Sequence, residues 1–155
     1  MAMASVRDVA TYILRARGSM SAMKLQKLVY YSQAWHLVWE ERPLFPDPVE
    51  AWANGPVVPS LYQQHRGKFI VGQGDFSGDP TVLSEDERSS IDAVLRFYGD
   101  KSAHWLSELS HRERPWAEAR EAAGLGPGER GGAVIPQASM AEFYDGLTNT
   151  ESTTV

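Results

Sequence analysis

Residues 21–41 read SAMKLQKLVYYSQAWHLVWEE, and this stretch decides the fold. Apolar side chains recur along one helical stripe of it, and aromatic and aliphatic side chains fill much of the opposite side. A helix that is apolar on most sides lies buried at the centre of a protein. Gln26 and Lys27 are among the polar residues that interrupt the apolar run, so we do not interpret it as a membrane span. We predict a central buried helix here, with Ser21 as its N-cap.

Segments on both sides of this stretch carry the start and stop signals of further helices. Ser5 and Asp8 have the spacing of a capping box, and Gly18 stands where a helix would end. Similar signals predict helices that begin near Pro59, Ser84, Ser102, Pro115 and Ser139. We therefore predict a mainly α fold, a compact single-domain bundle of about six or seven helices around the central helix from about Ala22 to Glu41.

The connections between these helices leave room for little strand. The prolines within residues 43–48 forbid a helix, and residues 49–52 read as a short extended segment before the turn Asn54-Gly55-Pro56. Residues 67–80 predict a loop or a small hairpin, and residues 124–132 predict a mobile, glycine-rich loop. We expect at most a short β segment or hairpin.

The chain of 155 residues suits one domain with a core of its own. We assign residues 1–147 to a helical domain and expect the polar residues 148–155 to form a disordered tail. No apolar leader precedes the first predicted helix, and no apolar run is long enough to span a bilayer. We therefore expect a cytoplasmic protein that binds no membrane.

Composition excludes several further classes of protein. The absence of cysteine rules out disulfides, cysteine zinc sites and a thiol nucleophile. The net charge of −5 disfavours binding to nucleic acid. Residues 1–30 nevertheless carry five basic side chains against Asp8 alone. Two interpretations of this basic end stay open, a solvated helix face or a surface for an acidic partner.

The densest polar cluster is His111-Arg112-Glu113-Arg114-Pro115-Trp116. His and Glu two residues apart share a face only in an extended segment, where they could bind a metal or act as acid and base. No third metal ligand is in view. We therefore interpret His111, Glu113, Pro115 and Trp116 as a structural motif in which the two polar groups bond the backbone and the indole packs in the core. With no nucleophile elbow or phosphate loop either, we predict no enzyme, no metal and no cofactor.

Five tryptophans are many for a chain of this length. Tryptophan and tyrosine are core residues first, but they are also enriched at the energetic centres of protein interfaces. The central helix, together with Trp52 and Tyr62, could frame a groove for a protein partner. The opening pair of helices around Gly18-Ser19 also resembles a helix-turn-helix, but the second helix is too long and too apolar for an exposed recognition helix.

Five short motifs, in order, resemble the Panacea domain, the SocA-like antitoxin family that also includes phage-associated GepA-like proteins. The motifs are Lys24-Leu25-Gln26-Lys27-Leu28-Val29-Tyr30-Tyr31, Pro43-Leu44-Phe45, Glu50-Ala51-Trp52, Gly55-Pro56-Val57-Val58-Pro59 with Tyr62, and Ser110-His111-x-Glu113-x-Pro115-Trp116. Each motif is short, but their order and spacing make the match specific. The resemblance spans about Val6 to Tyr144 and has no major departure within the motifs.

The resemblance implies an antitoxin that binds a toxin encoded by an adjacent gene and blocks it by direct contact. The resemblance also implies that members of the family pair with unrelated toxins, including alarmone-synthetase-like translation inhibitors and Fic-type enzymes. Two alternatives stay open: an adaptor that delivers its toxin to a protease, and a DNA-binding autorepressor. Formation of a homo-oligomer stays open as well.

Basic and aromatic residues of the motif-bearing segments give a candidate partner surface. We expect Lys24, Lys27, Tyr31, Trp52 and Tyr62 to border the contact with the toxin. An interface of this kind buries roughly 1,200–2,000 Å² in total. Its binding energy concentrates in a few Trp, Tyr or Arg side chains.

Overall fold

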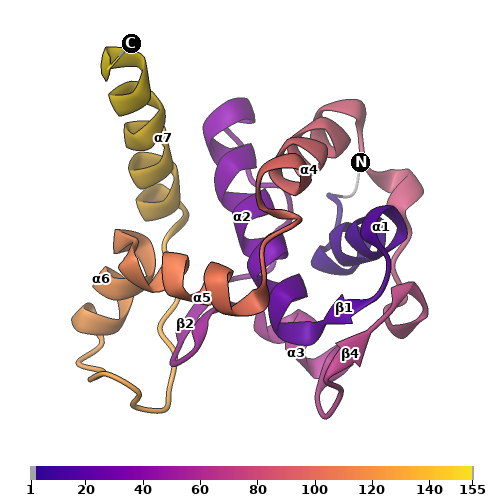
Figure 1. Ribbon diagram of the computed structural model, residues 1–155, viewed down its shortest axis with the longest axis horizontal. Coiled ribbons are helices and arrows are strands. Elements are labelled where there is room, and N and C mark those ends of the chain that lie inside the picture. Colours follow the sequence, from indigo (N-terminus) through magenta and orange to yellow (C-terminus); the bar gives the residue numbers. More distant parts are fainter. Residues whose placement is uncertain (1–2, 155) are drawn as a thin grey trace.

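The computed structural model describes residues 3–154, with the side chains of residues 3–148, and has the predicted mainly α fold (Figure 1). Within these residues seven α-helices are joined by two short two-stranded sheets and two 3-10 turns. The elements are α1 (Val6–Arg17), β1 (Met20–Ser21), α2 (Ala22–Glu40), β2 (Glu50–Trp52), β3 (Gly55–Val57), α3 (Pro59–His65), β4 (Ile70–Val71), η1 (Gln73–Asp75), η2 (Pro80–Val82), α4 (Glu85–Tyr98), α5 (Ala103–Arg112), α6 (Arg114–Ala122) and α7 (Gln137–Thr154).

Helix α2 lies at the centre of the molecule, as the sequence predicts. In Figure 1 it runs through the middle of the ribbon, between α4 and α7. It packs against α1, α4, α5 and α7, and most of its side chains are buried. Ser21 caps its start, since the Ser21 hydroxyl accepts a hydrogen bond from the Lys24 backbone N–H at 3.1 Å. The helix ends at Glu40, and the next residue, Glu41, takes a left-handed backbone conformation with φ 57°.

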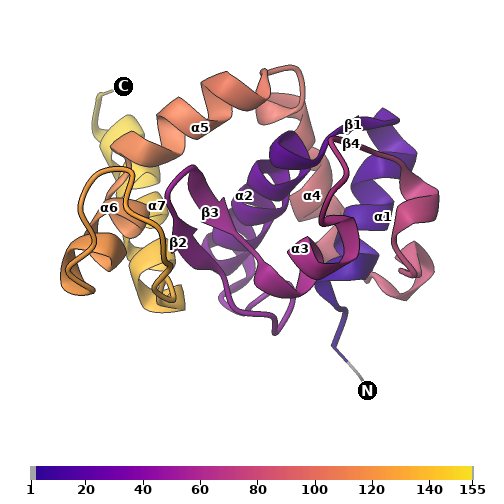
Figure 2. The same ribbon diagram turned by 90° about the horizontal axis from the view of Figure 1, so that it is seen from below.

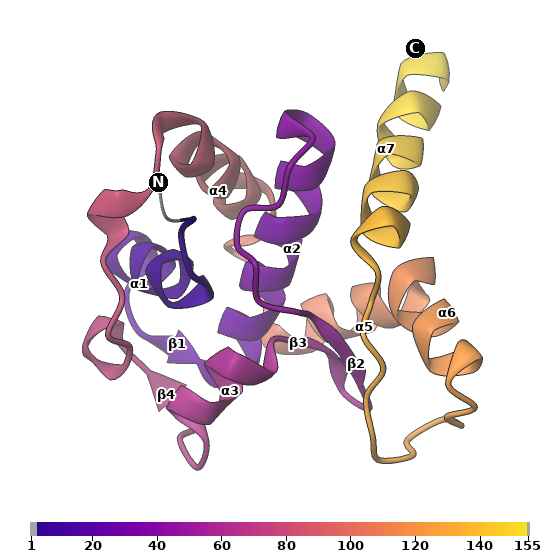
Figure 3. The same ribbon diagram turned by 180° about the vertical axis from the view of Figure 1, so that it is seen from behind.

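Two glutamines seven residues apart on α2 hold the chain that returns from its far end. The side-chain amide of Gln33 accepts from the Leu44 N–H at 2.7 Å and donates to the Phe45 carbonyl at 2.8 Å. Gln26 accepts from the Val58 N–H at 2.9 Å. Because residues seven apart share one face of a helix, the returning segment runs back along α2 toward β2 and β3 (Figure 3).

The two sheets differ in how well the sequence predicts them. Strand β2 confirms the extended segment expected at residues 49–52, and it pairs with β3 across the predicted turn. The small hairpin that the sequence allowed within residues 67–80 is not formed. Strand β4 pairs instead with β1, antiparallel and 50 residues away, with Met20 opposite Val71. The exposed link between α1 and α2 thereby obtains partners for its backbone groups.

Residues 133–135 add a third extended segment beside β2, on the side away from β3 (Figure 2). The Ala51 N–H donates to the Ala133 carbonyl at 2.8 Å, and the Ile135 N–H donates to the Val49 carbonyl at 2.8 Å. The segment follows the glycine-rich loop directly, so it fixes where that loop returns to the body of the protein.

Helix α7 closes the bundle against α2 and α6. It begins at Gln137, directly after Pro136, so the start predicted at Ser139 is wrong by two residues. The helix continues to Thr154, through the segment predicted as a tail, and Val155 lies outside the described residues. The division between a domain and a tail after residue 147 stays a prediction. No helix within the described residues is long and apolar enough to cross a bilayer.

Candidate partner-binding groove

A groove of about 960 Å³ opens beside the first turns of α2. Its other walls come from the β2–β3 hairpin, from α3, from residues 67–69, from the first residue of α5 and from residues 130–132. We call it the hairpin groove. Figure 2 looks at the side of the molecule on which the hairpin, α3 and the start of α2 meet. A volume near 1,000 Å³ is at the upper end for small-molecule sites and also suits a segment of a partner protein.

Three of the five predicted contact residues line the hairpin groove: Lys27, Trp52 and Tyr62. Lys24 lies half-buried one helical turn before Lys27, outside the lining. Tyr31 lies in the core, where its side chain is 0% exposed. This is a correction to the predicted surface: Tyr31 lies one turn beyond Lys27 on the same face of α2, where its ring packs against Tyr98 and Tyr144 and does not line the groove.

One wall of the groove is aromatic. The Trp52 and Tyr62 rings meet edge to face with their centroids 5.0 Å apart, and His65 follows Tyr62 at 5.3 Å. The Trp52 indole N–H donates to Glu50 Oε1 at 2.9 Å, which fixes the plane of the ring. Phe69 extends the apolar surface and is 79% exposed. An exposed aromatic surface beside a cavity is typical of a contact site.

Lys27 is a buried cation in this wall. Its side chain is 1% exposed, and its Nζ donates a hydrogen bond of 3.3 Å to the Pro56 carbonyl. Among the described residues no carboxylate lies within 4.0 Å of Nζ. Gly55 makes room for it, since a Cβ at that position, where φ is 123°, would lie 2.6 Å from Lys27 Cε. Burial lowers the pKa of Lys27 from 10.5 to about 8.

We expect Lys27→Met to raise the free energy of unfolding at pH 7 by about 1–2 kcal/mol. A pKa of about 8 in place of 10.5 means that the buried charge costs about 3 kcal/mol, against about 1 kcal/mol for the lost hydrogen bond to Pro56. The unfolded chain keeps its proton between pH 8 and 10.5 and the folded chain does not, so wild-type stability rises with pH in this window. Urea unfolding at several pH values should show that the difference in the free energy of unfolding between the variant and wild type decreases between pH 8 and 10.5. A variant less stable than wild type at pH 7 would contradict this account.

Glu113 lies behind the groove and bonds tyrosines rather than the backbone. It is the N-cap residue of α6, and its Oε1 accepts from the Tyr31 hydroxyl at 2.7 Å and from the Tyr144 hydroxyl at 2.8 Å. The Tyr144 and Tyr30 hydroxyls lie 3.1 Å apart. Burial raises the pKa of the Glu113 carboxyl, although the two tyrosine hydrogen bonds oppose the rise. One buried oxygen thus connects α2, α6 and α7, which the sequence analysis did not foresee.

The other members of this motif support the hairpin from below. The His111 ring stacks on Trp116 with centroids 4.2 Å apart, and the Trp116 indole N–H donates to the Trp52 carbonyl at 2.7 Å. Trp116 is half-buried at the edge of the core rather than at its centre. Pro115 is buried in the first turn of α6, where its missing N–H has no helical acceptor. The motif therefore holds the backbone that carries Trp52.

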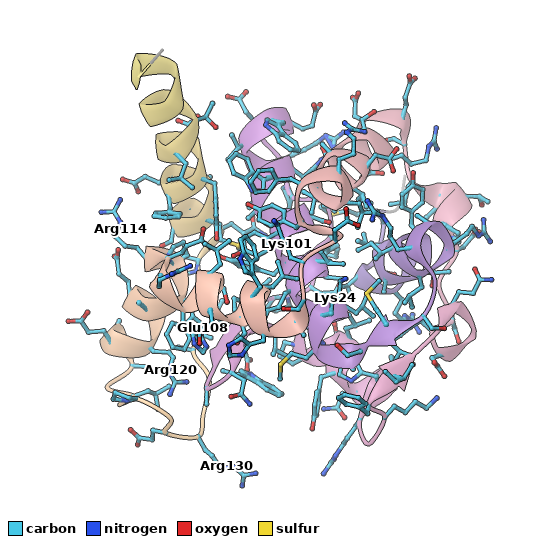
Figure 4. All side chains as sticks on the ribbon, in the orientation of Figure 1. Lys24, Lys101, Glu108, Arg114, Arg120 and Arg130 are labelled. Atoms are coloured by element: carbon cyan, nitrogen blue, oxygen red, sulfur yellow. The ribbon has the colours of Figure 1, made fainter. Side chains whose placement is uncertain are left out.

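Arg120 is the residue of this region that sequence analysis missed. Its buried guanidinium donates to four carbonyls of the surrounding chain, those of Ala51 at 3.0 Å, Gly126 at 3.1 Å, Glu129 at 2.6 Å and Gly131 at 3.2 Å. Figure 4 shows Arg120 inside the bend of the glycine-rich loop and Arg130 at its outer edge. The loop predicted to be mobile is therefore tied to α6 and β2 by one side chain. An arginine on a short helix gives no sequence signal for this.

The histidines and carboxylates do not form a metal site within the described residues, since no three of them converge. His36, the histidine of the central helix, shares a hydrogen bond of 2.7 Å with Ser90 Oγ through Nδ1 and accepts from Arg42 at Nε2. Burial, the largest cause, lowers the pKa of His36 to about 4. It is a neutral core side chain at physiological pH.

Comparison with known proteins places these features in context. The sequence model of one family, described as Antitoxin SocA-like, Panacea domain, matches residues 25–117. A curated relative, Antitoxin SocA of Caulobacter vibrioides, is 33% identical to this chain over 108 residues. The match covers 62% of this chain and 57% of the relative, so the chain spans little more than half of the relative's length. No solved structure matches the chain.

Proposed function

This chain belongs to the SocA-like Panacea domain family of antitoxins, and from that premise we propose that it neutralises a cognate protein toxin by direct binding through the hairpin groove. The observation that carries the proposal is the aromatic wall of the groove. Trp52, Tyr62 and Phe69 present aromatic surface beside a cavity large enough for a segment of a partner. The family match covers residues 25–117, which include Trp52, Tyr62 and Phe69.

The proposal assigns a binding role without catalysis to this chain. Two titratable groups of the region are engaged in the fold: Glu113 bonds tyrosine hydroxyls, and His65 bonds the Gln26 amide at 2.9 Å. The toxin would be a growth inhibitor of the alarmone-synthetase-like or Fic type implied by the family resemblance, encoded beside this protein. Inhibition by contact and delivery of the toxin to a protease both begin with the same binding step, so the groove is the first site to test for either.

The experiment that tests the proposal is co-expression with the product of the adjacent reading frame. We expect the neighbour alone to arrest growth, and this chain to restore growth and to co-purify with the neighbour. A protease-deficient host separates the two modes of action, since rescue there requires inhibition by binding. A neighbour that is harmless alone, or one that stays toxic and unbound, would contradict the proposal. Salt-sensitive binding to the promoter of its own gene, without toxin binding, would favour the autorepressor instead.

Among groove residues, we expect Tyr62→Ala and Phe69→Ala each to weaken toxin binding by about tenfold to thirtyfold, as truncation of an interface anchor does. Phe97→Ala is the matched control, because Phe97 is 66% exposed on α4 and does not line the groove. Isothermal titration gives the affinities, and thermal melting checks that each variant folds. Equal affinities for the Phe69 and Phe97 variants would show that the toxin binds elsewhere.

A further inference from the structure

We infer that the hairpin groove receives an acidic segment of the toxin, and that one carboxylate of this segment becomes the counter-ion of Lys27. The inference rests on the proposed function, because it names the chemistry of the toxin segment that the same groove would hold. It is carried by the charges of the lining, by the helix ends that meet there and by the environment of Lys27.

The lining of the groove is basic although the chain is acidic. Lys27, Lys68 and Arg130 line it against one acidic side chain, Glu50, and the chain as a whole carries −5. Glu50 already accepts a hydrogen bond from the Trp52 indole. Lys68 has Asp75 as a partner, whereas no ion pair is found for Arg130 among the described residues. The groove is therefore a local positive site on a chain of net negative charge.

Two helix N-termini add to this positive field. Ala22 and Met23, in the first turn of α2, line the groove, and so does Ala103, the first residue of α5. The N-terminus of an α-helix carries a partial positive charge. In α2 the Ala22 N–H already donates to the Phe69 carbonyl and the Lys24 N–H to Ser21 Oγ, so this end contributes mainly its charge. Both helices have ten or more residues, so their dipoles are well developed. Two such ends and the cations of the lining act on the same space.

Lys27 is the group in the groove that most needs an anion. Its ammonium has three N–H donors and makes one long hydrogen bond, to the Pro56 carbonyl. A buried charge without a counter-ion is destabilising, and a partner that supplies one removes that cost on binding. Lys27 is 1% exposed and the backbone of Gly55 lies directly against it, so the carboxylate reaches Nζ when the turn at Gly55 and Pro56 shifts on binding.

The apolar part of the lining decides between a protein and a nucleic acid as the source of the anion. Met23, Trp52 and Phe69 border the same cavity as Lys27 and require apolar contact in addition to charge. A nucleic acid would bring a continuous row of phosphates toward a chain of net charge −5. An acidic peptide segment that also carries apolar side chains satisfies both requirements locally, so the toxin is the favoured source.

A double-mutant cycle in the purified complex tests the inference. The toxin is the neighbouring product that arrests growth in the co-expression experiment above, and each of its Asp and Glu residues is changed to Asn or Gln. We expect Lys27→Met to weaken the complex by about thirtyfold or more. We further expect one toxin carboxylate whose loss weakens binding to wild type but not to Lys27→Met, since the two groups then act as a pair. Arg96→Met, an exposed change on α4 outside the groove, should leave affinity unchanged.

The outcomes separate this inference from the function it rests on. Failure of wild type to bind any neighbouring product overturns the proposed function. Tight binding by wild type and equally by Lys27→Met, or the lack of any carboxylate coupled to Lys27, overturns the inference while the antitoxin role stands. Loss of the complex on nuclease treatment overturns it in favour of a nucleic acid. A Lys27→Met variant that melts at or above the wild-type temperature shows that weaker binding is not a folding defect.

Discussion

Replacing Arg120 with methionine is expected to lower the free energy of unfolding by about 4 kcal/mol and the melting temperature by about 10 °C. Methionine fills most of the volume of the arginine stem but donates no hydrogen bond. Four carbonyls, those of Ala51, Gly126, Glu129 and Gly131, then lose a charged donor. Each hydrogen bond to a charged group contributes about 1.5–3 kcal/mol, and water reaches the exposed carbonyls of the loop, so the sum is discounted.

The same change is expected to weaken toxin binding at temperatures where the variant is still folded. Residues 130–132 line the hairpin groove, and a Cβ added at Gly132 would lie 2.5 Å from the Trp52 ring, so the loop packs closely on the aromatic wall. Arg130→Met is the stability control, because this exposed residue lies on the same loop and makes no ion pair in the described chain. Differential scanning calorimetry measures both variants. Equal melting temperatures for the two would show that Arg120 does not hold the loop.

Glu113→Ala is expected to lower the free energy of unfolding by about 3 kcal/mol while leaving the affinity of the folded protein for the proposed toxin nearly unchanged. The alanine leaves the buried hydroxyls of Tyr31 and Tyr144 without their acceptor, at about 1–3 kcal/mol each. The alanine variant no longer buries a carboxylate, and the desolvation cost that disappears offsets part of that loss. Glu113→Gln keeps an acceptor oxygen and should stay within about 1 kcal/mol of wild type.

The pH dependence separates the charge of Glu113 from its hydrogen bonds. Because burial raises the pKa of this carboxyl in the folded state, its contribution to stability is complete below the ordinary value of 4.5 and is lost as pH rises through the raised value. Glu113→Gln does not titrate, so its stability relative to wild type should increase as the pH increases from 4 to 8. Glu118→Ala, an exposed change on the same helix, is the control. A wild-type protein that gains stability relative to Glu113→Gln over this range would contradict the assignment.

What the sequence predicts well is what neighbouring residues decide. The central helix, the cap at Ser21 and the helix that starts at Pro59 follow from spacing and from cap chemistry, which act within a few residues. The pairing of β1 with β4 and the four bonds of Arg120 join segments that meet only after folding. No pattern of neighbouring residues indicates these contacts, so they could not be predicted from the sequence.

The candidate site shows the same division. Lys27, Trp52 and Tyr62 come together at the groove as their motifs suggested, because a buried-helix lysine and adjacent aromatic residues stand out in the sequence. Tyr31 stands out equally in the sequence. Because α2 is apolar on most sides, the sequence does not show which of its side chains the other elements will cover. In this fold α4 and α7 cover the Tyr31 side: its ring stacks on Tyr98 at 4.2 Å and meets Tyr144 at 6.0 Å.

Arg120 bonds only to backbone carbonyls, which every amino acid provides. Apart from Gly128 and Gly131, whose φ values of 73° and 126° favour glycine, the side chains of residues 126–131 are therefore not specified by the group that holds the loop in place. The Glu129 side chain is an exception, since its Oε2 accepts from the Gly126 N–H at 2.7 Å. At the other exposed positions, substitutions can change the shape and charge of the rim while the path of the loop is retained. Under the proposed function, substitutions at a few exposed side chains of this rim would change which toxin segment the groove accepts and leave the core unaltered.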